Sequence, residues 1–366
     1  MAKLMGWIPT AIGRVKEAHV LHPKYEEARS LLTAACFATL KGEVIVLVGP
    51  SRIGKSRCVK DALTIPSPNE PDEFGHMRAV IVEAGNDSKS GEFSTKAFMV
   101  ECHCAIRHPF FGVPDGRDGW KPRLLTSLDR TPEGTLRAAF QDALKCRSTE
   151  YFVVDEAHHV GYAPGGYPAA ARILDSYKVL AARANAKLVF TGSYQLLELL
   201  ELVPHLVGRQ RTLEFPRYHA SSHADVLGWQ QILQAFSEYI VFRGSESLCD
   251  WNQYLFEGSL GSIGHLSIWL RYALAKAMVD GSPALTKRHL EQTRYPFSQE
   301  ETLLKEMVAG ERHMLQICEA GLESCGDGSD WAGKADVQVS PEAKRKAHKR
   351  KPFERKSRRN KAGARV

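Results

Sequence analysis

Two kinds of apolar pattern alternate along the first 218 residues of the chain. One is a short run of consecutive apolar residues, many of them β-branched, and the other is an apolar stripe at helical spacing. The short runs predict strands at 43–48, 78–83, 151–154, 187–191 and 211–215, and the stripes predict helices at 22–40, from the glycine loop to Leu63, at 94–107 and at 131–145. Strands that are apolar throughout are typical of a parallel sheet covered on both faces. We therefore predict an α/β domain at 21–218 around a five-stranded parallel sheet.

The strand pattern stops after Pro216. Helical stripes follow at 222–240, 247–256, 263–279, 286–292 and 298–319, the last opened by the capping box Ser298-Gln299-Glu300-Glu301. We predict a small helical lid domain at 219–320, an N-terminal extension at 1–20 and a flexible basic tail at 321–366. The stretch 109–132 holds four prolines and three glycines and predicts a loop, after which Thr131 is expected to cap a helix.

Charge is divided unevenly along the chain, whose formal net charge is +7. Residues 341–366 contain twelve lysines and arginines against two glutamates, a net charge of +10. Of the 49 basic and 42 acidic residues in the whole chain, positions 1–340 therefore hold 37 and 40, a net charge of −3. Any attraction to nucleic acid that is inferred from overall charge belongs first to the tail.

The remaining composition excludes several classes of protein. No apolar run approaches the roughly 18 residues of a membrane span, and the N-terminus has no signal pattern, so we expect a soluble intracellular protein without membrane partners. The eight cysteines are scattered and form no disulfide framework. Cys102-His103-Cys104 with His108 lacks the second ligand pair of a zinc site, and the helical spacing around it favours buried core cysteines.

The strongest chemical signal is a glycine-rich loop between the first strand and the next helix. Gly49-Pro50-Ser51-Arg52-Ile53-Gly54-Lys55-Ser56 matches G-x-x-x-x-G-K-[ST] in the strand-then-helix context that this motif requires. The loop amides and the helix N-terminus bind phosphate oxygens. Lys55 would reach the β and γ phosphates, and Ser56 would hold Mg²⁺. We predict ATP and Mg²⁺ as cofactors, bound by residues 49–56 with the adjacent Arg57.

A second motif follows about 100 residues later. The strand Tyr151-Phe152-Val153-Val154 ends in Asp155 and Glu156. Asp155 is predicted to complete the Mg²⁺ shell and Glu156 to act as the general base toward water, which indicates hydrolysis. The strand at 187–191 ends near Thr191 and Ser193, either of which is a candidate γ-phosphate sensor; the alternative is that both are ordinary strand-end turn residues.

Arginines flank the fifth strand. Arg209 and Arg211 stand at its start and Arg217 follows its end, and an arginine finger supplied in trans is one interpretation. The alternative is a solvated basic turn. In the helical part, His265 and Arg271 are candidates to approach the phosphates, although ordinary packing is the simpler explanation for either.

The order of phosphate loop, Asp-Glu strand, sensor strand, arginine-bearing edge and helical lid resembles the AAA+ ATPases. Shorter strings resemble the TnsC/TniB family, the ATPase regulators of bacterial transposons, including CRISPR-associated ones, over residues 15–290. These strings are His22-Pro23, Phe93-Ser94-Thr95-Lys96-Ala97-Phe98, Asp155-Glu156-Ala157-His158-His159, Phe215-Pro216-Arg217-Tyr218 and the glycine-rich segment before Trp269.

That resemblance implies an ATP-dependent homo-oligomer, a ring or helical filament around double-stranded DNA in the bacterial cytoplasm. It would connect a target-selector protein to the transposase, with hydrolysis controlling assembly. Ser94, Thr95 and Lys96 match the place of the family's DNA contacts and suit phosphate rather than base contacts; a helix cap beside a solvated lysine is the alternative. His265 stands where the family's second-sensor arginine is expected.

Other functions fit parts of the pattern. Asp155-Glu156-Ala157-His158 also matches a DEAH helicase box, but residues 219–366 hold no strand series for a second lobe. A replication loader or initiator of the AAA+ class shares the domain plan, and a nucleotide-gated scaffold with incidental hydrolysis is a further alternative. The basic tail is interpreted as a DNA tether, a docking peptide for a partner or a solubility tail.

Overall fold

Five parallel strands form the central sheet of the computed structural model, which describes residues 6–63, 69–86, 90–114, 120–122, 131–203 and 208–323. The strands are β1 (Val44–Val48), β2 (Ala79–Glu83), β5 (Tyr151–Asp155), β6 (Lys187–Gly192) and β7 (Gln210–Glu214). Their spatial order is β2-β5-β6-β1-β7. Every residue of β1 is fully buried, as expected for the centre of a covered sheet. The predicted α/β class and the five-stranded parallel sheet are confirmed.

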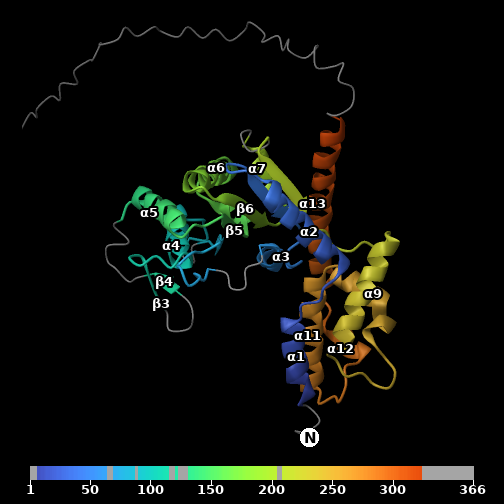
Figure 1. Ribbon diagram of the computed structural model, residues 1–366. Coiled ribbons are helices and arrows are strands. Elements are labelled where there is room, and N and C mark those ends of the chain that lie inside the picture. The colour runs from blue at the N-terminus through green and yellow to red at the C-terminus, as the bar shows by residue number, and fades with distance from the viewer. Residues whose placement is uncertain are drawn as a thin grey trace, which may run out of the picture. The chain divides into compact units, whose positions relative to one another are not determined.

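Helices cover both faces of this sheet (Figure 1). They are α2 (Pro23–Ala38), α3 (Lys55–Ala62), α4 (Thr95–Ala105), α5 (Glu133–Cys146), α6 (Gly166–Ala184) and α7 (Gln195–Glu201), with a 3₁₀ turn η1 (Ala157–Tyr162) after β5. α2 and α3 share a buried cluster with Ile45 and Leu47 of β1. Phe152 of β5 points to the opposite face because side chains alternate along a strand, and there it packs against Phe140 of α5.

The helical part of the chain has its own core. It contains α9 (His223–Ser237), η2 (Leu248–Trp251), α10 (Asn252–Ser259), α11 (Ile263–Val279) and α12 (Lys287–Thr293), followed by the long α13 (Phe297–Glu323). Trp229 and Trp269 are buried at its centre. None of the described helices is long and apolar enough to cross a membrane.

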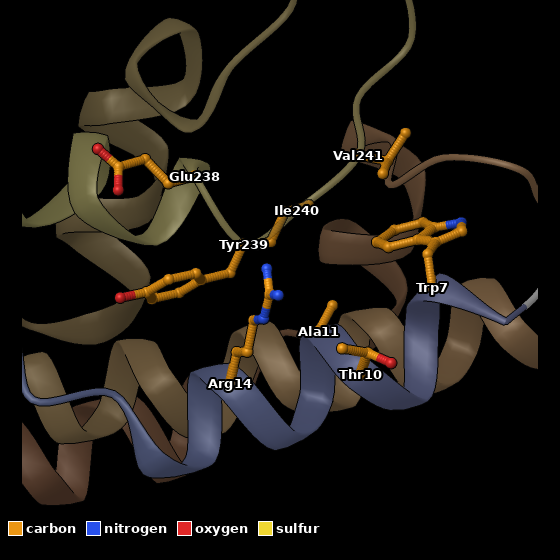
Figure 2. Close-up of a pocket in the computed structure, with 8 residues that line it drawn as sticks. All are labelled: Trp7, Thr10, Ala11, Arg14, Glu238, Tyr239, Ile240 and Val241. Atoms are coloured by element: carbon orange, nitrogen blue, oxygen red, sulfur yellow. The ribbon is translucent and has the colours of Figure 1, made fainter.

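An N-terminal helix joins this second core. α1 (Trp7–Glu17) buries Ile8, Ala11 and Val15 in the same cluster as α9 and α11. Figure 2 shows residues of α1 facing the segment 238–241 across a hollow of about 310 Å³. The sequence pattern predicted only an extension here, because eleven residues hold too few apolar positions to distinguish a docked helix from a solvated one.

Three local predictions need correction. The stretch 109–132 contains an antiparallel strand pair, β3 (Gly112–Pro114) and β4 (Trp120–Pro122). Helix α5 is preceded by Pro132 in the cap position, with no side-chain cap from Thr131. Helix α13 begins at Phe297, so Ser298 lies inside its first turn instead of at the cap position, and Glu301 pairs with Lys305 instead of closing a capping box.

The predictions for the cysteines fall on residues that the structure describes, and the prediction for the basic tail does not. Cys102 and Cys104 of α4 are buried free cysteines, as the helical spacing predicts. The contacts divide the chain into two units, Met1–Leu315 and Gln316–Val366, and the sheet and the helical core both lie in the first. The basic tail lies outside the described residues, which end at 323.

Candidate nucleotide-hydrolysis site

The phosphate loop joins the carboxyl end of β1 to α3, and two of its glycines are required by its geometry. A Cβ atom at Gly49 would lie 2.3 Å from the carbonyl oxygen of Phe215, so no larger residue fits beside the end of β7. Gly54 caps α3 with φ at +114°, a conformation that favours glycine. Arg52 also has a left-handed backbone, with φ at 63°. The loop therefore has the curled backbone that a phosphate requires.

Lys55 lies inside this loop. Its side chain is buried, and Nζ donates hydrogen bonds to the carbonyl oxygens of Gly49 (3.1 Å) and Pro50 (2.9 Å). Burial lowers the pKa of Lys55, while Glu156 and Asp155 act to raise it. Two carboxylates thus oppose the cost of burying the ammonium group.

The rest of the predicted phosphate-loop set lies around this lysine. Pro50 and Ile53 are buried, Gly54 and Ser56 are half-buried, and the side chains of Ser51, Arg52 and Arg57 are exposed. Ser56 follows Lys55 in the first turn of α3. The helix N-terminus and the loop amides therefore stand at the same end of the helix.

The acidic pair stands at the end of β5. The hydroxyl of Thr191 donates to Oδ1 of Asp155, and the backbone N–H of Glu156 donates to the same oxygen at 3.0 Å. Glu156 has φ at 50°, so the chain turns sharply directly after Asp155. Burial raises the pKa of Glu156, and Lys55 lowers it. A partly buried carboxylate of raised pKa beside a buried lysine is the expected setting of a general base.

The two sensor candidates at the end of β6 have different hydrogen-bond partners. Thr191 is engaged with Asp155. Ser193 is buried, and its hydroxyl has no hydrogen-bond partner among the described residues. Because β6 lies between β1 and β5, both residues reach the edge that carries the phosphate loop. The sequence showed two equivalent hydroxyls, and the fold gives them different surroundings.

Helix α11 touches the phosphate loop directly. A Cβ atom at Gly264 would lie 1.9 Å from the carbonyl oxygen of Arg52, so the helix and the loop meet backbone to backbone. The next residue, His265, is buried, and its pKa is lowered by burial and by Arg52. Arg271 lies two turns further along and donates to the carbonyl oxygen of Ser267. The sequence analysis did not single out Gly264, because the need for a glycine at this position comes from Arg52, which is distant in the sequence.

Several strings that carry the family resemblance meet beside this contact. Nδ1 of His22 lies 2.8 Å from the hydroxyl of Tyr218. A Cβ atom at Gly261 would lie 2.2 Å from the carbonyl oxygen of Tyr218. The ring of His22 also lies 6.2 Å from that of Phe215. Segments that are about 200 residues apart in sequence thus form one junction between the sheet and the helical part.

The arginines lie at opposite ends of β7. The carbonyl oxygen of Arg209 accepts a hydrogen bond from Val44, and Arg211 pairs with Ile45, both at the amino end of β1. Gly49 lies four residues further along, about 13 Å at roughly 3.3 Å per residue. Both arginine side chains are exposed.

Arg217 lies at the phosphate-loop end of the same strand. Its guanidinium donates to both carboxylate oxygens of Glu311 in α13, at 2.7 and 3.1 Å, and to the carbonyl oxygen of Leu260. This arginine is therefore engaged by the chain's own C-terminal helix. The sequence offered no signal for that pair, because 94 residues separate its members.

The three predicted DNA contacts lie at the start of α4. Ser94 caps the helix by accepting from the backbone N–H of Ala97 at 3.2 Å. The hydroxyl of Thr95 donates to Glu133 at 2.7 Å, and Lys96 is half-buried. Ser94 is therefore a helix cap, as the alternative interpretation states. The N-terminus of α4 is suited to phosphate oxygens.

A phosphate loop at the carboxyl edge of a parallel sheet, with an Asp-Glu pair two strands away, defines a P-loop ATPase. Residues 40–200 match the family model of the AAA domain. This stretch holds the phosphate loop and the Asp155-Glu156 pair, so the chain carries an ATPase domain of the AAA type. Nucleotide binding is typical of this domain.

One solved structure shows the same fold at low sequence identity, and two others are more distantly similar. Cdc6p from Pyrobaculum aerophilum is 15% identical, with a TM-score of 0.51 over 79% of this chain and 73% of that one. The Walker-type ATPase PABY2304 of Pyrococcus abyssi is 15% identical, with a TM-score of 0.46 over 81% and 76%. The ADP form of the Aeropyrum pernix ORC2 protein is 15% identical, with a TM-score of 0.48 over 76% and 71%. No curated protein matches the chain in sequence.

Proposed function

We propose that this AAA ATPase is a nucleotide-controlled switch that works as an oligomer on double-stranded DNA. The observation that carries the oligomer is the position of its arginines. Phosphoryl transfer in this class uses an arginine to stabilise the transition state. Arg209 and Arg211 are exposed about 13 Å from the start of their own phosphate loop, and Arg217 is paired with Glu311. We therefore infer that Arg209 or Arg211 serves the phosphate loop of a second copy of the chain.

The residues at the site support ATP hydrolysis with the following roles. The loop amides of 49–56 and Lys55 would hold the phosphates, and Ser56 and Asp155 would hold Mg²⁺, which would neutralise charge on the phosphate oxygens. Glu156 takes a proton from water as the water oxygen bonds to the γ-phosphorus and the bond to the bridging oxygen breaks. Ser193, whose buried hydroxyl has no partner among the described residues, is the proposed γ-phosphate sensor, and His265 brings the helical part to the loop.

Two classes of DNA switch agree with this chemistry. The first is an initiator or loader of the AAA+ class, since the overall fold is similar to that of Cdc6p from Pyrobaculum aerophilum. The second is a TnsC/TniB-type regulator that connects a target selector to a transposase. The similarity in fold favours the first class. The second class is supported by the sequence strings around His22, Tyr218 and Gly261, which meet at one junction.

The DNA contact is proposed at Ser94, Thr95 and Lys96, with the tail at 341–366 adding reach. Backbone N–H groups at the start of α4 and a lysine beside them suit a phosphate and carry no base preference. Glu133 accepts from Thr95, so a contact by that hydroxyl would have to replace this bond. A helicase activity is not proposed, since the described residues from 215 to 323 contain no second parallel sheet.

Mixing of subunits tests the oligomer. Lys55→Ala removes the phosphate contact but leaves the arginines, whereas an Arg209→Ala, Arg211→Ala double variant leaves the phosphate loop intact. Each preparation alone should be inactive, and a mixture should recover ATPase activity because intact loops then meet intact arginines. Arg183→Ala, at an exposed arginine in the last turn of α6, is the matched control and should retain activity. A mixture no more active than its parts argues against an arginine in trans.

Microscopy and partner assays test the DNA role. Electron microscopy of the protein with an ATP analogue and duplex DNA should show a DNA-dependent ring or filament, and its absence would refute the proposal. A TnsC-type protein should recruit a transposase to this assembly, whereas a loader should deposit a helicase. Deleting 341–366 should lower the salt slope of DNA binding or abolish partner recruitment.

A further inference from the structure

One imidazole nitrogen lies between the proposed general base and the turn that carries the proposed γ-phosphate sensor. His158 is the second residue of η1, two positions after Glu156. Its Nδ1 lies 3.3 Å from Oε2 of Glu156. The same Nδ1 lies 3.3 Å from the backbone nitrogen of Ser193, whose N–H points toward it. Three segments of the site therefore meet at a single atom.

That atom cannot serve both neighbours at once. Burial lowers the pKa of His158 to about 4, so the ring is neutral at neutral pH. In a neutral imidazole one ring nitrogen carries the proton and the other carries a lone pair. If Nδ1 is protonated it donates to Glu156, and if it is not it accepts from Ser193. The two contacts belong to different tautomers of His158.

The position of the ring is determined by close packing. A Cβ atom at Gly192, the last residue of β6, would lie 3.2 Å from Nδ1 of His158 and 3.3 Å from its backbone nitrogen. Only 14% of the His158 side chain is exposed. A displacement of the turn after β6 is therefore transmitted to the imidazole by contact.

We propose that His158 is a positioning residue that couples Glu156 to the turn at Ser193. When Nδ1 donates to Oε2 of Glu156, it holds the carboxylate in place while the other carboxylate oxygen receives the proton of water. When the turn presents the N–H of Ser193, Nδ1 accepts that bond, its proton lies on Nε2, and Glu156 loses this positioning contact. The proposal rests on the assignment of Glu156 as the base, and it is independent of DNA and of oligomeric state.

Steady-state ATPase kinetics of the full chain with Mg²⁺ and ATP test this coupling. His158→Leu removes both hydrogen bonds, and we expect kcat to fall at least about tenfold, a part of the roughly 10²–10⁴-fold that general-base catalysis contributes. The KM for ATP should stay within about threefold, because the substitution leaves the phosphate loop and Lys55 in place to bind the phosphates. His158→Asn places an amide near the position of Nδ1 and should recover most of kcat.

Two further variants separate the outcomes. His159→Leu removes the neighbouring imidazole of the same turn and should leave kcat within about twofold, whereas Gly192→Ala presses on the His158 ring and should lower kcat without raising KM. Unchanged kcat in His158→Leu, a KM that rises as kcat falls, or no recovery by His158→Asn would overturn the proposal. If Glu156→Gln leaves turnover unchanged, the base assignment itself is wrong. If Glu156→Gln is inactive and His158→Leu is normal, only the coupling is wrong.

Discussion

The contact between α11 and the phosphate loop gives a prediction whose size follows from the structure. Gly264→Ala adds one methyl group where the carbonyl oxygen of Arg52 lies 1.9 Å from the new Cβ position, and the carbonyl carbon and Cβ of Arg52 each lie 2.8 Å from it. Real Cβ atoms do not approach within 3.0 Å, so the two backbones must separate by about 1.1 Å. Two of the opposing atoms belong to the backbone, so no rotamer change relieves the clash.

The energetic cost follows from overpacking a close contact. Inserting a methyl group of this kind costs about 1–3 kcal/mol. Since 1 kcal/mol shifts Tm by about 2–4 °C in domains of 150–250 residues, Tm should fall by about 2–12 °C. Because the displaced helix carries His265 away from the loop, nucleotide affinity should fall about tenfold, equivalent to about 1.4 kcal/mol.

Thermal unfolding and titration of a fluorescent ATP analogue measure both effects. Gly13→Ala is the matched control, because Gly13 lies within α1 and nothing lies within 4 Å of its Cβ position. That substitution should stabilise the protein by about 0.5–1 kcal/mol through helix propensity and leave nucleotide affinity unchanged. If Gly264→Ala melts and binds nucleotide as the wild type does, the close approach of α11 to Arg52 is not a feature of the protein.

Three further predictions concern other contacts. Because burial raises the pKa of Glu156 above its ordinary value, its proton is retained to higher pH, and kcat should fall as pH drops through that raised pKa; a flat acidic limb in the pH profile would contradict this. Glu311→Gln weakens a nearly buried ion pair in which Arg217 makes two hydrogen bonds, and it should lower the free energy of unfolding by about 2 kcal/mol. Urea denaturation measures this change, and an unchanged urea midpoint would contradict the prediction. Lys96→Gln should reduce the slope of log affinity for duplex DNA against log salt by about 1, whereas Lys305→Gln, at an exposed lysine of α13, should leave it unchanged.

Arg217 differs from Arg209 and Arg211 in its place on the sheet. All three flank the same strand, and the sequence presents them as equivalent candidates. The direction of β7 beside β1 places Arg217 at the phosphate edge and the other two at the opposite edge. The bond to Glu311 then links α13 to the end of β7. Variants that break this pair will show whether α13 restrains the site.

Much of the ATPase could be predicted because its signals are local. Strands buried on both faces must be apolar throughout, so β1, β5 and β6 are visible as continuous runs. The phosphate loop is equally visible, since its glycines and lysine lie within seven consecutive residues and the backbone of the turn requires both glycines. The β3–β4 pair escaped prediction because two three-residue strands with prolines leave no periodicity to detect.

The relations between distant residues needed the folded chain. Thr191 and Ser193 differ in their surroundings only because β6 lies beside β5, which gives one hydroxyl to Asp155 and leaves the other without a partner among the described residues. His158 contacts a turn 35 residues away, and Gly264 meets Arg52 across more than 200 residues. Periodicity records whether a residue is buried, but not which partner buries it. Strand order and helix docking select that partner, and they depend on the packing of the whole chain.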